Sequence, residues 1–329
     1  MPPPTDDMTA HAEPPLLSTL LVNYNTRELL DPCLQALRSA LAPVGGGPIL
    51  VVDNASRDGS VEHLHRHAPD VRLWCSEHNV GFGRANNLAL PAVDTPYLLL
   101  LNTDAFVPPD SLATTLAYMQ AHPDCGVLGV RLIGRDGALQ PSCRYFPTPW
   151  NGFLGRTGLS RWLPGRPVDD MAWAHDQVRD CDWVPGCFYL LRMDAVRQVG
   201  LFDPRYFLYF EEVDHCRALK AAGWRVVFHP GTEVVHLGGE SAAKDHALSR
   251  HGRQVPTLQI ESALLYFRKQ HGRTGLAAHL LLEALGSGYI GLKGLLRHRS
   301  LAPAADEWRR QRTVWSLWRA TAGGTRPTR

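Results

Sequence analysis

The residues with the clearest potential for chemistry lie at the end of an apolar run. Tyr97 to Leu101 has the character of a buried strand, and Asn102-Thr103-Asp104 follows it directly. Such a continuous run is typical of a central strand in a parallel sheet that is covered on both faces. Ligands bind to these sheets beyond the carboxyl ends of the strands, where Asn102 and Asp104 would offer oxygen atoms to a divalent cation. The alternative interpretation of Asp104 is a helix N-cap that follows the strand.

Polar residues also end two other apolar segments in the first half of the chain. Asn23 and Asn25 follow the first predicted strand, and Asp53 and Asn54 follow the second. Because the carboxyl ends of parallel strands share one edge of a sheet, these side chains would line one crevice with Asp104. Asp53 is suited to accept hydrogen bonds from a base or a ribose. Its structural alternative is an Asx turn with Asn54.

A short glycine-containing segment, Gly81 to Asn87, follows the third predicted strand. Its spacing matches neither a dinucleotide-binding loop nor a Walker loop. It combines glycines with Arg84, Asn86 and Asn87, and a loop of this kind can approach a diphosphate closely. We therefore expect these three side chains to contribute to a donor site.

Acidic residues that could act as a general base lie in the second half of the chain. Glu211 and Glu212 follow the aromatic run 206–210, which suits a base in a partly desolvated site. Asp214 lies three residues from Glu211, on the same face of a predicted helix. The alternative interpretation is that the helix dipole favours acids in the first turn.

Two further candidates are a metal ligand and a wall for an acceptor. His236 ends a predicted strand beside Gly238 and could ligate a metal, although a single histidine is more often structural. The segment from Trp183 to Gly186 has no catalytic chemistry of its own. We interpret it as a wall for an acceptor, and a simple core strand is the alternative.

Strand and helix patterns alternate through the first half, and their order must bring the polar sites together. A βαβα order predicts an α/β fold with a mostly parallel, doubly wound sheet. Prolines interrupt the pattern after about residue 140, and regularity returns near residue 183. The predicted strands cover 16–25, 48–54, 71–75, 97–102, 127–133, 183–192, 225–228 and 232–235. The predicted helices cover 27–40, a segment capped by Ser60, 84–90, 111–121, 193–199, 211–222, 258–269 and 276–296.

The composition narrows the class of protein. The 329 residues, 44% of them hydrophobic, suffice for one large core or two modest ones. A formal net charge of +2 gives no support for nucleic-acid binding. The seven cysteines form no Cys-x-x-Cys pair, which argues against a disulfide framework or a structural zinc site and favours a reducing cytoplasm. Residues 1–15 lack the pattern of a secretory signal, so we expect a disordered lead-in.

The apolar segment 276–296 invites a comparison with membrane helices. His279, Glu283 and Lys293 interrupt it, which argues against a helix that spans a bilayer. Arginines and tryptophans follow at 297–319, and this combination suits contact with a membrane surface. The alternative interpretation is a pair of helices that closes the core and ends in a solvated basic region.

Six motifs, in this order along the chain, closely resemble family 2 glycosyltransferases, especially their bacterial rhamnosyltransferase-like branch. The resemblance runs from about residue 17 to about residue 240 and implies a GT-A fold over 16–250, with a helical C-terminal extension at 251–329. It divides the GT-A domain into a nucleotide-binding half at 16–124 and an acceptor half at 125–250. The matching segments are Leu21–Asn25, Val51–Ser60, Asn79–Asn87, Leu101–Asp104, Phe210–Asp214 and Val235–His236.

The resemblance also implies roles for individual residues. Asp53 would contact the nucleoside, and Asp104 and His236 would hold Mg²⁺ or Mn²⁺ on the donor diphosphate. Glu212 stands at the position of the family's catalytic base. The chain departs from the family pattern at two of these positions: Asn102 replaces the first Asp of a strict Asp-x-Asp motif, and Glu212 replaces the more usual Asp.

The implied activity is inverting transfer of a sugar from a nucleotide-diphosphate donor to a hydroxyl of a saccharide or lipid-linked saccharide. The branch favours dTDP-L-rhamnose, with UDP- and GDP-sugars left open, and implies cell-surface polysaccharide synthesis at the cytoplasmic face of the plasma membrane. One alternative is a sugar nucleotidyltransferase, which would need a basic, glycine-rich loop where this chain has Asn23 to Thr26. The other is a sugar-nucleotide-binding protein without turnover. A nicotinamide dehydrogenase is disfavoured because no Gly-x-Gly-x-x-Gly follows the first strand.

Overall fold

The strand at the centre of the structure is the apolar run that ends in Asn102. We describe a computed structural model that covers residues 14–238, 249–250, 253–254 and 256–329. The first five residues of β4 (Tyr97–Asn102) are buried, and alternate leucines contact the two faces of the sheet. This alternation follows from the two-residue period of a strand, and burial on both faces explains the unbroken apolar run.

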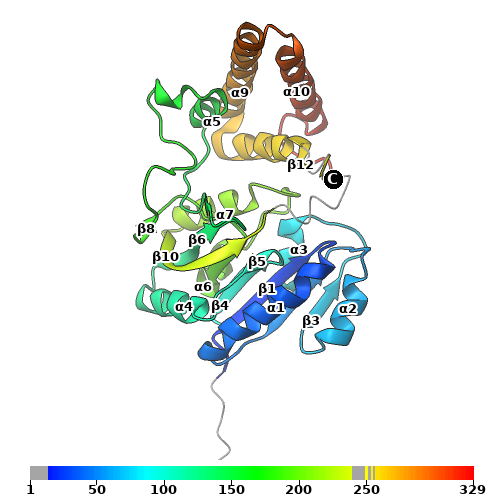
Figure 1. Cartoon of the computed structure of the whole chain (residues 1–329), viewed down its shortest axis with the longest axis vertical. Coiled ribbons are helices and arrows are strands. Elements are labelled where there is room, and N and C mark those ends of the chain that lie inside the picture. Colours follow the sequence, from blue (N-terminus) through cyan, green and yellow to red (C-terminus); the bar gives the residue numbers. More distant parts are fainter. Residues whose placement is uncertain (1–13, 239–248, 251–252, 255) are drawn as a thin grey trace, which may run out of the picture.

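Ten strands form the main sheet, in the order β3-β2-β1-β4-β9-β6-β10-β5, with β7 paired to β6 and β8 paired to β10 (Figure 1). The strands are β1 Leu17–Asn23, β2 Ile49–Asp53, β3 Arg72–Cys75, β5 Ala105–Phe106, β6 Cys125–Ile133, β7 Leu139–Gln140, β8 Arg179–Asp180, β9 Phe188–Arg192 and β10 Arg225–His236. A separate pair consists of β11 Ser249–Arg250 and β12 Arg253–Gln254.

The helices cover both faces of the sheet. They are α1 Arg27–Leu41, α2 Ser60–His67, α3 Phe82–Ala89, α4 Ser111–Ala121, α5 Pro149–Thr157, α6 Met193–Val199, α7 Glu211–Ala221, α9 Pro256–His298 and α10 Ala302–Ala320. Short 3₁₀ turns are η1 Ala42–Val44, η2 Leu90–Ala92 and η3 Leu159–Arg161. Leucines of α1 and α4 pack in one core layer. Residues of α3, α6, α7 and the first part of α9 pack in the other.

The first half of the sheet is parallel, as predicted, whereas the second half is mixed. Strands β3, β2, β1 and β4 run parallel, but β9 pairs antiparallel with both β4 and β6. The predicted strand 183–192 begins only at Phe188. The strands predicted at 225–228 and 232–235 form one strand, β10, with a shift of register between His229 and Glu233.

One predicted helix cap is wrong in its position. Ser60 is the first residue of α2, and Gly59 before it takes the left-handed conformation with φ of 81°. Ser60 instead donates from both its backbone N–H and its hydroxyl to Asp58 Oδ1. The cap prediction failed because the carboxylate of Asp58, which lies before the helix, accepts the hydrogen bond from the first backbone N–H of α2.

The C-terminal extension packs on the side of the domain that carries α7. Gly272 (φ 68°, ψ −162°) kinks α9, and the segment beyond the kink rises away from the sheet with α10 alongside it (Figure 1). By length and composition alone, Thr257–Arg297 could cross a membrane, which is weak evidence for a span. Most of the predicted lead-in and the join between the two predicted domains lie outside the described residues.

Candidate active site

The carboxyl ends of β2, β1 and β4 lie level with one another, and this register brings predicted polar residues together. Asn23 pairs in register with Asp53, and Val22 pairs with Asn102. Asn23 Nδ2 donates to Asp53 Oδ2 at 2.7 Å, and Ser56 N donates to Asp53 Oδ1 at 2.9 Å. The expectation that the strand ends meet is therefore confirmed for Asn23 and Asp53.

A hollow of about 500 Å³ lies outside the ends of β2 and β3, which is a size suited to a small ligand such as a nucleoside. Asn25 shapes its rim, since Asn25 Oδ1 accepts a hydrogen bond from Arg57 N at 2.8 Å. Asn25 and Ala55 both have positive φ, an uncommon conformation that often marks functional loops. The hollow is lined by Tyr24, Asp53, Ala55, Ser56, Arg57, Val61, Glu62, Cys75, Ser76, Glu77, His78 and Asn79.

The side chains of the glycine-containing segment are engaged by the protein's own backbone. Asn87 Nδ2 donates to Phe202 O at 2.7 Å, and Phe202 N donates to Asn87 Oδ1 at 3.2 Å. Arg84 donates to the carbonyl of Pro204, and Asn86 donates to the carbonyl of Phe82. The contacts of Arg84 and Asn87 brace the loop that leads into α7, whereas that of Asn86 stays within α3. A direct role in donor binding stays a prediction for all three side chains.

The backbone of the glycine-containing segment also closely approaches the backbone of the loop before α7. Phe82 N donates to Phe207 O at 2.9 Å, and a Cβ atom at Gly81 would lie 2.2 Å from that oxygen. Asn54 supports the arrangement, since it accepts from Val80 N and donates to Asn79 Oδ1. Glycine is required here because any side chain would separate the segment from the loop before α7.

Asp104 and His236 lie side by side, although they come from distant parts of the sequence. Their proximity follows from the antiparallel pairing of β5 with the end of β10, in which His236 is opposite Ala105. His236 Nε2 lies 3.5 Å from Asp104 Oδ1. Asp104 is 5% exposed, and its Oδ2 accepts a hydrogen bond from Gly238 N at 3.1 Å.

Gln140 fixes which nitrogen of His236 faces the carboxylate. Gln140 Nε2 donates to the carbonyl of His236 at 2.8 Å, so the amide oxygen of Gln140 must face His236 Nδ1, 2.9 Å away. An amide oxygen only accepts, which makes Nδ1 the protonated nitrogen and leaves the Nε2 lone pair of the neutral ring for a metal ion that Asp104 would also bind. Buried polar partners of this kind commonly orient metal-binding histidines.

The pair fits a divalent cation held partly by its substrate. A carboxylate oxygen and an imidazole nitrogen are suitable ligands for Mn²⁺, and Mg²⁺ also binds through few carboxylates together with phosphate oxygens. Within the residues that the structure describes, no group of three or more His, Cys, Asp or Glu side chains could hold a metal. The donor diphosphate would therefore have to complete the coordination.

Two of the three acids predicted as catalytic, Glu211 and Glu212, stand at the start of α7. Tyr209 and Phe210 before them have φ of 71° and 68°, and two consecutive residues in this conformation indicate a strained entry to the helix. Burial raises the pKa of Glu211 well above its usual range, and the charge of Glu212 adds to the rise. Glu211 Oε2 is buried without a hydrogen-bond partner.

Glu212 is partly buried and has a cation near it. Burial raises the pKa of Glu212, whereas its backbone N–H and the charge of Arg144 oppose the rise. A carboxyl with a pKa raised toward neutrality is suited to accept a proton from a substrate hydroxyl. Burial raises the pKa of the Cys187 thiol, and the charges of Asp104 and Glu212 both add to that rise. Both carboxylates are thus close enough to Cys187 to act on its thiol electrostatically.

Comparison with known proteins identifies the family of the chain. Residues 18–170 match the family described as Glycosyl transferase family 2. The N-acetylglucosaminyl-diphospho-decaprenol L-rhamnosyltransferase of Mycobacterium tuberculosis is 32% identical over 295 residues, which span 82% of this chain and 94% of that protein. The chain belongs to glycosyltransferase family 2. The rhamnosyltransferase WbbL of Escherichia coli is 29% identical to this transferase over 168 residues, which span 47% of this chain and 60% of that protein.

Solved structures share the fold of this transferase. A mannosyltransferase from Pyrobaculum calidifontis, in complex with GDP-Man and Mn²⁺, aligns with a TM-score of 0.54 at 17% identity, over 95% of this chain and 87% of that chain. Residues 1–349 of TarS from S. aureus align with a TM-score of 0.51 at 13% identity, over 92% and 91% of the two chains. These similarities concern the fold, and they confirm the predicted GT-A architecture.

Asp214, the third acid predicted as catalytic, contacts residues of α9 and of the loop before α7. Its carboxylate is 2.5 Å from Lys269 Nζ and accepts a hydrogen bond from Gln270 Nε2 at 2.5 Å. Tyr206 donates to it as well, at 3.3 Å. These partners engage both carboxylate oxygens and tie α7 to α9, so the contacts favour an anchoring role for Asp214 over a catalytic one.

Two polar residues near the acids and the metal-binding pair escaped the sequence analysis. Gln140 and Arg144 both lie in the region that prolines made difficult to interpret. The Arg144 guanidinium lies 3.9 Å from the ring centre of Trp183 and is also paired with Asp169. Trp183 is 5% exposed, so it supports Arg144 and leaves little surface for an acceptor. Gly186 lies against Phe82, where an added Cβ atom would be 3.3 Å from the ring.

Proposed function

We propose that this transferase moves L-rhamnose from dTDP-L-rhamnose to a hydroxyl of a lipid-linked saccharide, with inversion at the anomeric carbon. The proposal is supported by the relative from Mycobacterium tuberculosis, whose name specifies L-rhamnosyl transfer and an N-acetylglucosaminyl-diphospho-decaprenol acceptor. The setting would be polysaccharide synthesis on the cytoplasmic face of the membrane, where a nucleotide sugar meets a lipid-linked acceptor.

One structural observation carries the catalytic part of the proposal. Asp104 and His236 form a carboxylate–imidazole pair, and the Asp104 carboxylate shares the surroundings of Cys187 with that of Glu212. A site for the leaving diphosphate at Asp104 and a base for the attacking hydroxyl at Glu212 would then face one donor sugar. Such a site would suit a single displacement, in which the leaving group and the nucleophile occupy opposite sides of the transferred carbon.

The residues divide the chemistry between them. Glu212 would accept the proton of the acceptor hydroxyl as its oxygen forms a bond to the anomeric carbon. The bond from that carbon to the diphosphate oxygen breaks in the same step, and the nucleoside diphosphate leaves with the electron pair. Asp104 and His236 would hold Mg²⁺ or Mn²⁺, which when bound neutralises charge on the departing diphosphate. Asp53 would hold the nucleoside at the hollow beside β2.

The test is a transfer assay on the purified full chain. We would incubate it with dTDP-L-rhamnose, UDP-sugars or GDP-sugars, each with Mn²⁺, and with an N-acetylglucosaminyl-diphospho-polyprenol acceptor. The expected result is rhamnosylated lipid from dTDP-L-rhamnose, with the anomeric configuration inverted. Transfer from a different sugar nucleotide would contradict the donor assignment, and retention of configuration would contradict the displacement.

The same assay separates the two alternative functions. A sugar nucleotidyltransferase would instead form nucleotide sugar from a nucleoside triphosphate and a sugar phosphate. A binding protein without turnover would bind the donor, yet it would neither transfer the sugar nor hydrolyse the donor. Either outcome would overturn the proposal.

A further inference from the structure

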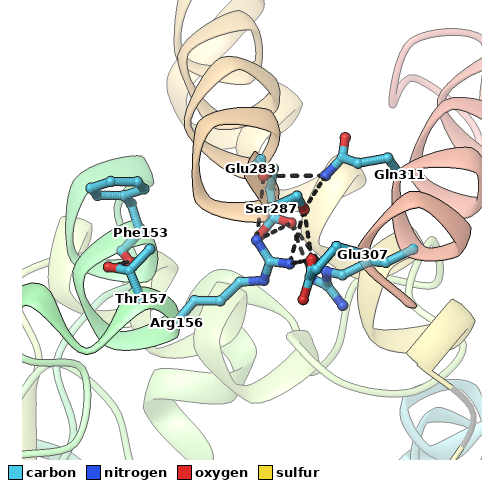
Figure 2. A network of polar contacts seen from close by, with 8 residues as sticks. Phe153, Arg156, Thr157, Glu283, Ser287, Glu307 and Gln311 are labelled. Carbon is cyan, nitrogen blue, oxygen red and sulfur yellow. Dashed lines mark hydrogen bonds and ion pairs between the residues drawn. The ribbon is translucent and has the colours of Figure 1, made fainter. Parts of the chain in front are cut away.

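The segment of α9 beyond the kink turns polar side chains toward the protein. Arg156 of α5 donates to Ser287 Oγ at 3.0 Å and is paired with Glu307 of α10 (Figure 2). Gln311 Nε2 donates to Ser287 Oγ at 2.8 Å, and Arg310 is paired with Glu283. The side chains of Arg156 and Glu283 are only 17% and 14% exposed. Around Glu283 and Ser287 the inner side of this helix thus carries a network of charged and hydroxyl groups, whereas nearer the kink Leu276 and Leu280 pack on the core.

The outer side of the same segment is apolar. Leu281, Leu285, Leu292 and Leu296 are 60%, 54%, 57% and 74% exposed, and we call these four residues the leucine face. Their spacing of four, seven and four residues places them along one side of a helix. Between residues 277 and 296 the other exposed residues on that side are Ala277, Ala278, Ala284, Gly288, Tyr289 and Leu295, and the exposed Arg273 and Thr274 precede them next to the kink.

This distribution is the reverse of that expected for a helix on a water-soluble domain. Such a helix buries its apolar side and exposes its polar side, because burial of apolar surface drives folding. Here Glu283 and Ser287 face inward while leucines on the same turns face outward. A contiguous exposed apolar surface of this kind marks a contact with another apolar phase or molecule.

We propose that the leucine face lies on the surface of an anionic lipid bilayer, with α9 in the plane of the interface. The leucines would enter the boundary between head groups and acyl chains, as in interfacial amphipathic helices. The adjacent exposed cations fit this partner: Lys293, Arg297 and Arg299 lie at the same end of the helix, and the described residues 293–301 contain no acid. Basic groups beside an apolar face favour an anionic membrane surface.

The exposed tryptophans of α10 and the inner polar network indicate which side of the C-terminal helices would face the bilayer. Trp308 and Trp315 are 67% and 44% exposed, and tryptophan is enriched at membrane interfaces. The paired charges of Arg156, Glu283 and Glu307 stay on the protein side of the helix. An in-plane position leaves that network intact, whereas a single spanning helix would have to expose Glu283 to lipid.

Membrane contact through this face would also orient the catalytic helix. The part of α9 before the kink is fixed to α7 through Lys269 and Asp214, and Ser262 Oγ donates to Leu208 O at 2.8 Å. A bilayer bound at the leucine face would therefore hold Glu212 at a set orientation to the membrane. Delivery of a lipid-linked acceptor to Glu212 rests on the proposed function, but binding of the bilayer does not.

Vesicle flotation of the purified full chain tests the proposal without any assay of transfer. We expect the protein to float with vesicles of phosphatidylglycerol and phosphatidylethanolamine, and to float less in high salt. Leu285→Glu, Leu292→Glu and Leu296→Glu combined should lower the bound fraction by ~100-fold, because three apolar side chains no longer enter the interface. All three side chains are exposed, so circular dichroism and the melting temperature should remain those of the wild type.

A matched variant adds three acids at other exposed apolar positions, Leu16→Glu, Met171→Glu and Val178→Glu, and should float like the wild type. Equal loss of flotation in both triple variants would mean that net charge alone governs binding and would overturn the proposal. So would wild-type protein that stays in the soluble fraction. Protein that resists extraction by alkaline carbonate would indicate a spanning helix instead. Dimers that the leucine-face variant dissociates, without vesicle binding, would assign the face to a second copy of this chain.

Discussion

His236 Nε2 lies 3.5 Å from Asp104 Oδ1, although the two residues are far apart in the sequence. The pairing of β5 with β10 creates this contact, and the hydrogen bonds from Gln140 hold the imidazole in its orientation. At this separation one ion could contact both atoms. An ion held by this pair would link the donor diphosphate to two strands that no local sequence pattern relates.

Removal of the carboxylate at Asp104 should abolish metal-dependent transfer. Asp104→Ala deletes a ligand of the proposed ion but affects few packing contacts, so the fold should persist. Transfer rates across a titration of Mn²⁺ would measure the effect, and Asp110→Ala, an exposed acid nearby, provides the control. Normal turnover with normal Mn²⁺ dependence in Asp104→Ala would exclude this residue from the metal site.

Gln140 should act on the metal through His236. Gln140→Ala removes the acceptor that fixes His236 Nδ1, so the concentration of Mn²⁺ for half-maximal transfer should rise by ~10- to 100-fold. At saturating Mn²⁺ the rate should recover, which distinguishes a positioning residue from one that acts in the reaction. An unchanged Mn²⁺ requirement would show that His236 is oriented without Gln140 or does not bind the ion.

Asp214 should matter for stability more than for catalysis. Asp214→Asn removes the buried charge that faces Lys269 and leaves Lys269 paired with Asp203 alone, so the free energy of unfolding should fall by about 2 kcal/mol. Urea unfolding would measure this loss. The transfer rate of the folded variant should stay near that of the wild type. A rate as low as that of Glu212→Gln would instead show that Asp214 takes part in catalysis.

Glu211 should destabilise the native protein near neutral pH. Its pKa is raised in the folded state, so the native protein binds more protons than the unfolded chain between the ordinary and the raised value. Stability must then fall as pH rises through that window. Glu211→Gln lacks this loss and should be more stable than the wild type near neutral pH. The difference should shrink as the pH falls toward the usual carboxyl range, and a pH-independent difference in unfolding free energy would contradict the argument.

The elements that local patterns encode were predictable from the sequence. The bounds predicted for β4, α4 and α6 agree with the structure because an apolar run or a helical period, ended by turn residues, encodes each element. The register that joins Asn23 to Asp53 follows from the parallel order of the first strands. The predictions were weakest between residues 134 and 187. There the helix α5 (Pro149–Thr157) was missed among the prolines, and the other segments are held by short bridges and side-chain contacts.

The residues that the sequence analysis missed depend on contacts between distant segments. Gln140 acts on His236 and Arg144 acts on Glu212, and no periodicity connects either pair. Asp214 was grouped with the catalytic acids because it shares their helix, yet Lys269 of α9 determines its environment. The helical extension was predicted from the sequence. The polar inner side of α9 was not, because it depends on the contact between Ser287 and Arg156 of α5, which is distant in the sequence.

We propose that Glu212 removes the proton from the acceptor hydroxyl. Glu212→Gln keeps the size of the side chain but cannot take up a proton at ordinary pH, whereas Glu211→Gln changes the neighbouring acid in the same way. The decisive measurement is the rate of glycosyl transfer by both variants, together with the affinity of each for the donor. We predict that Glu212→Gln transfers at least ~10²-fold more slowly than the wild type with donor affinity unchanged, and that Glu211→Gln is milder. Normal transfer by Glu212→Gln with an inactive Glu211→Gln would contradict the assignment and move the base to the other carboxylate.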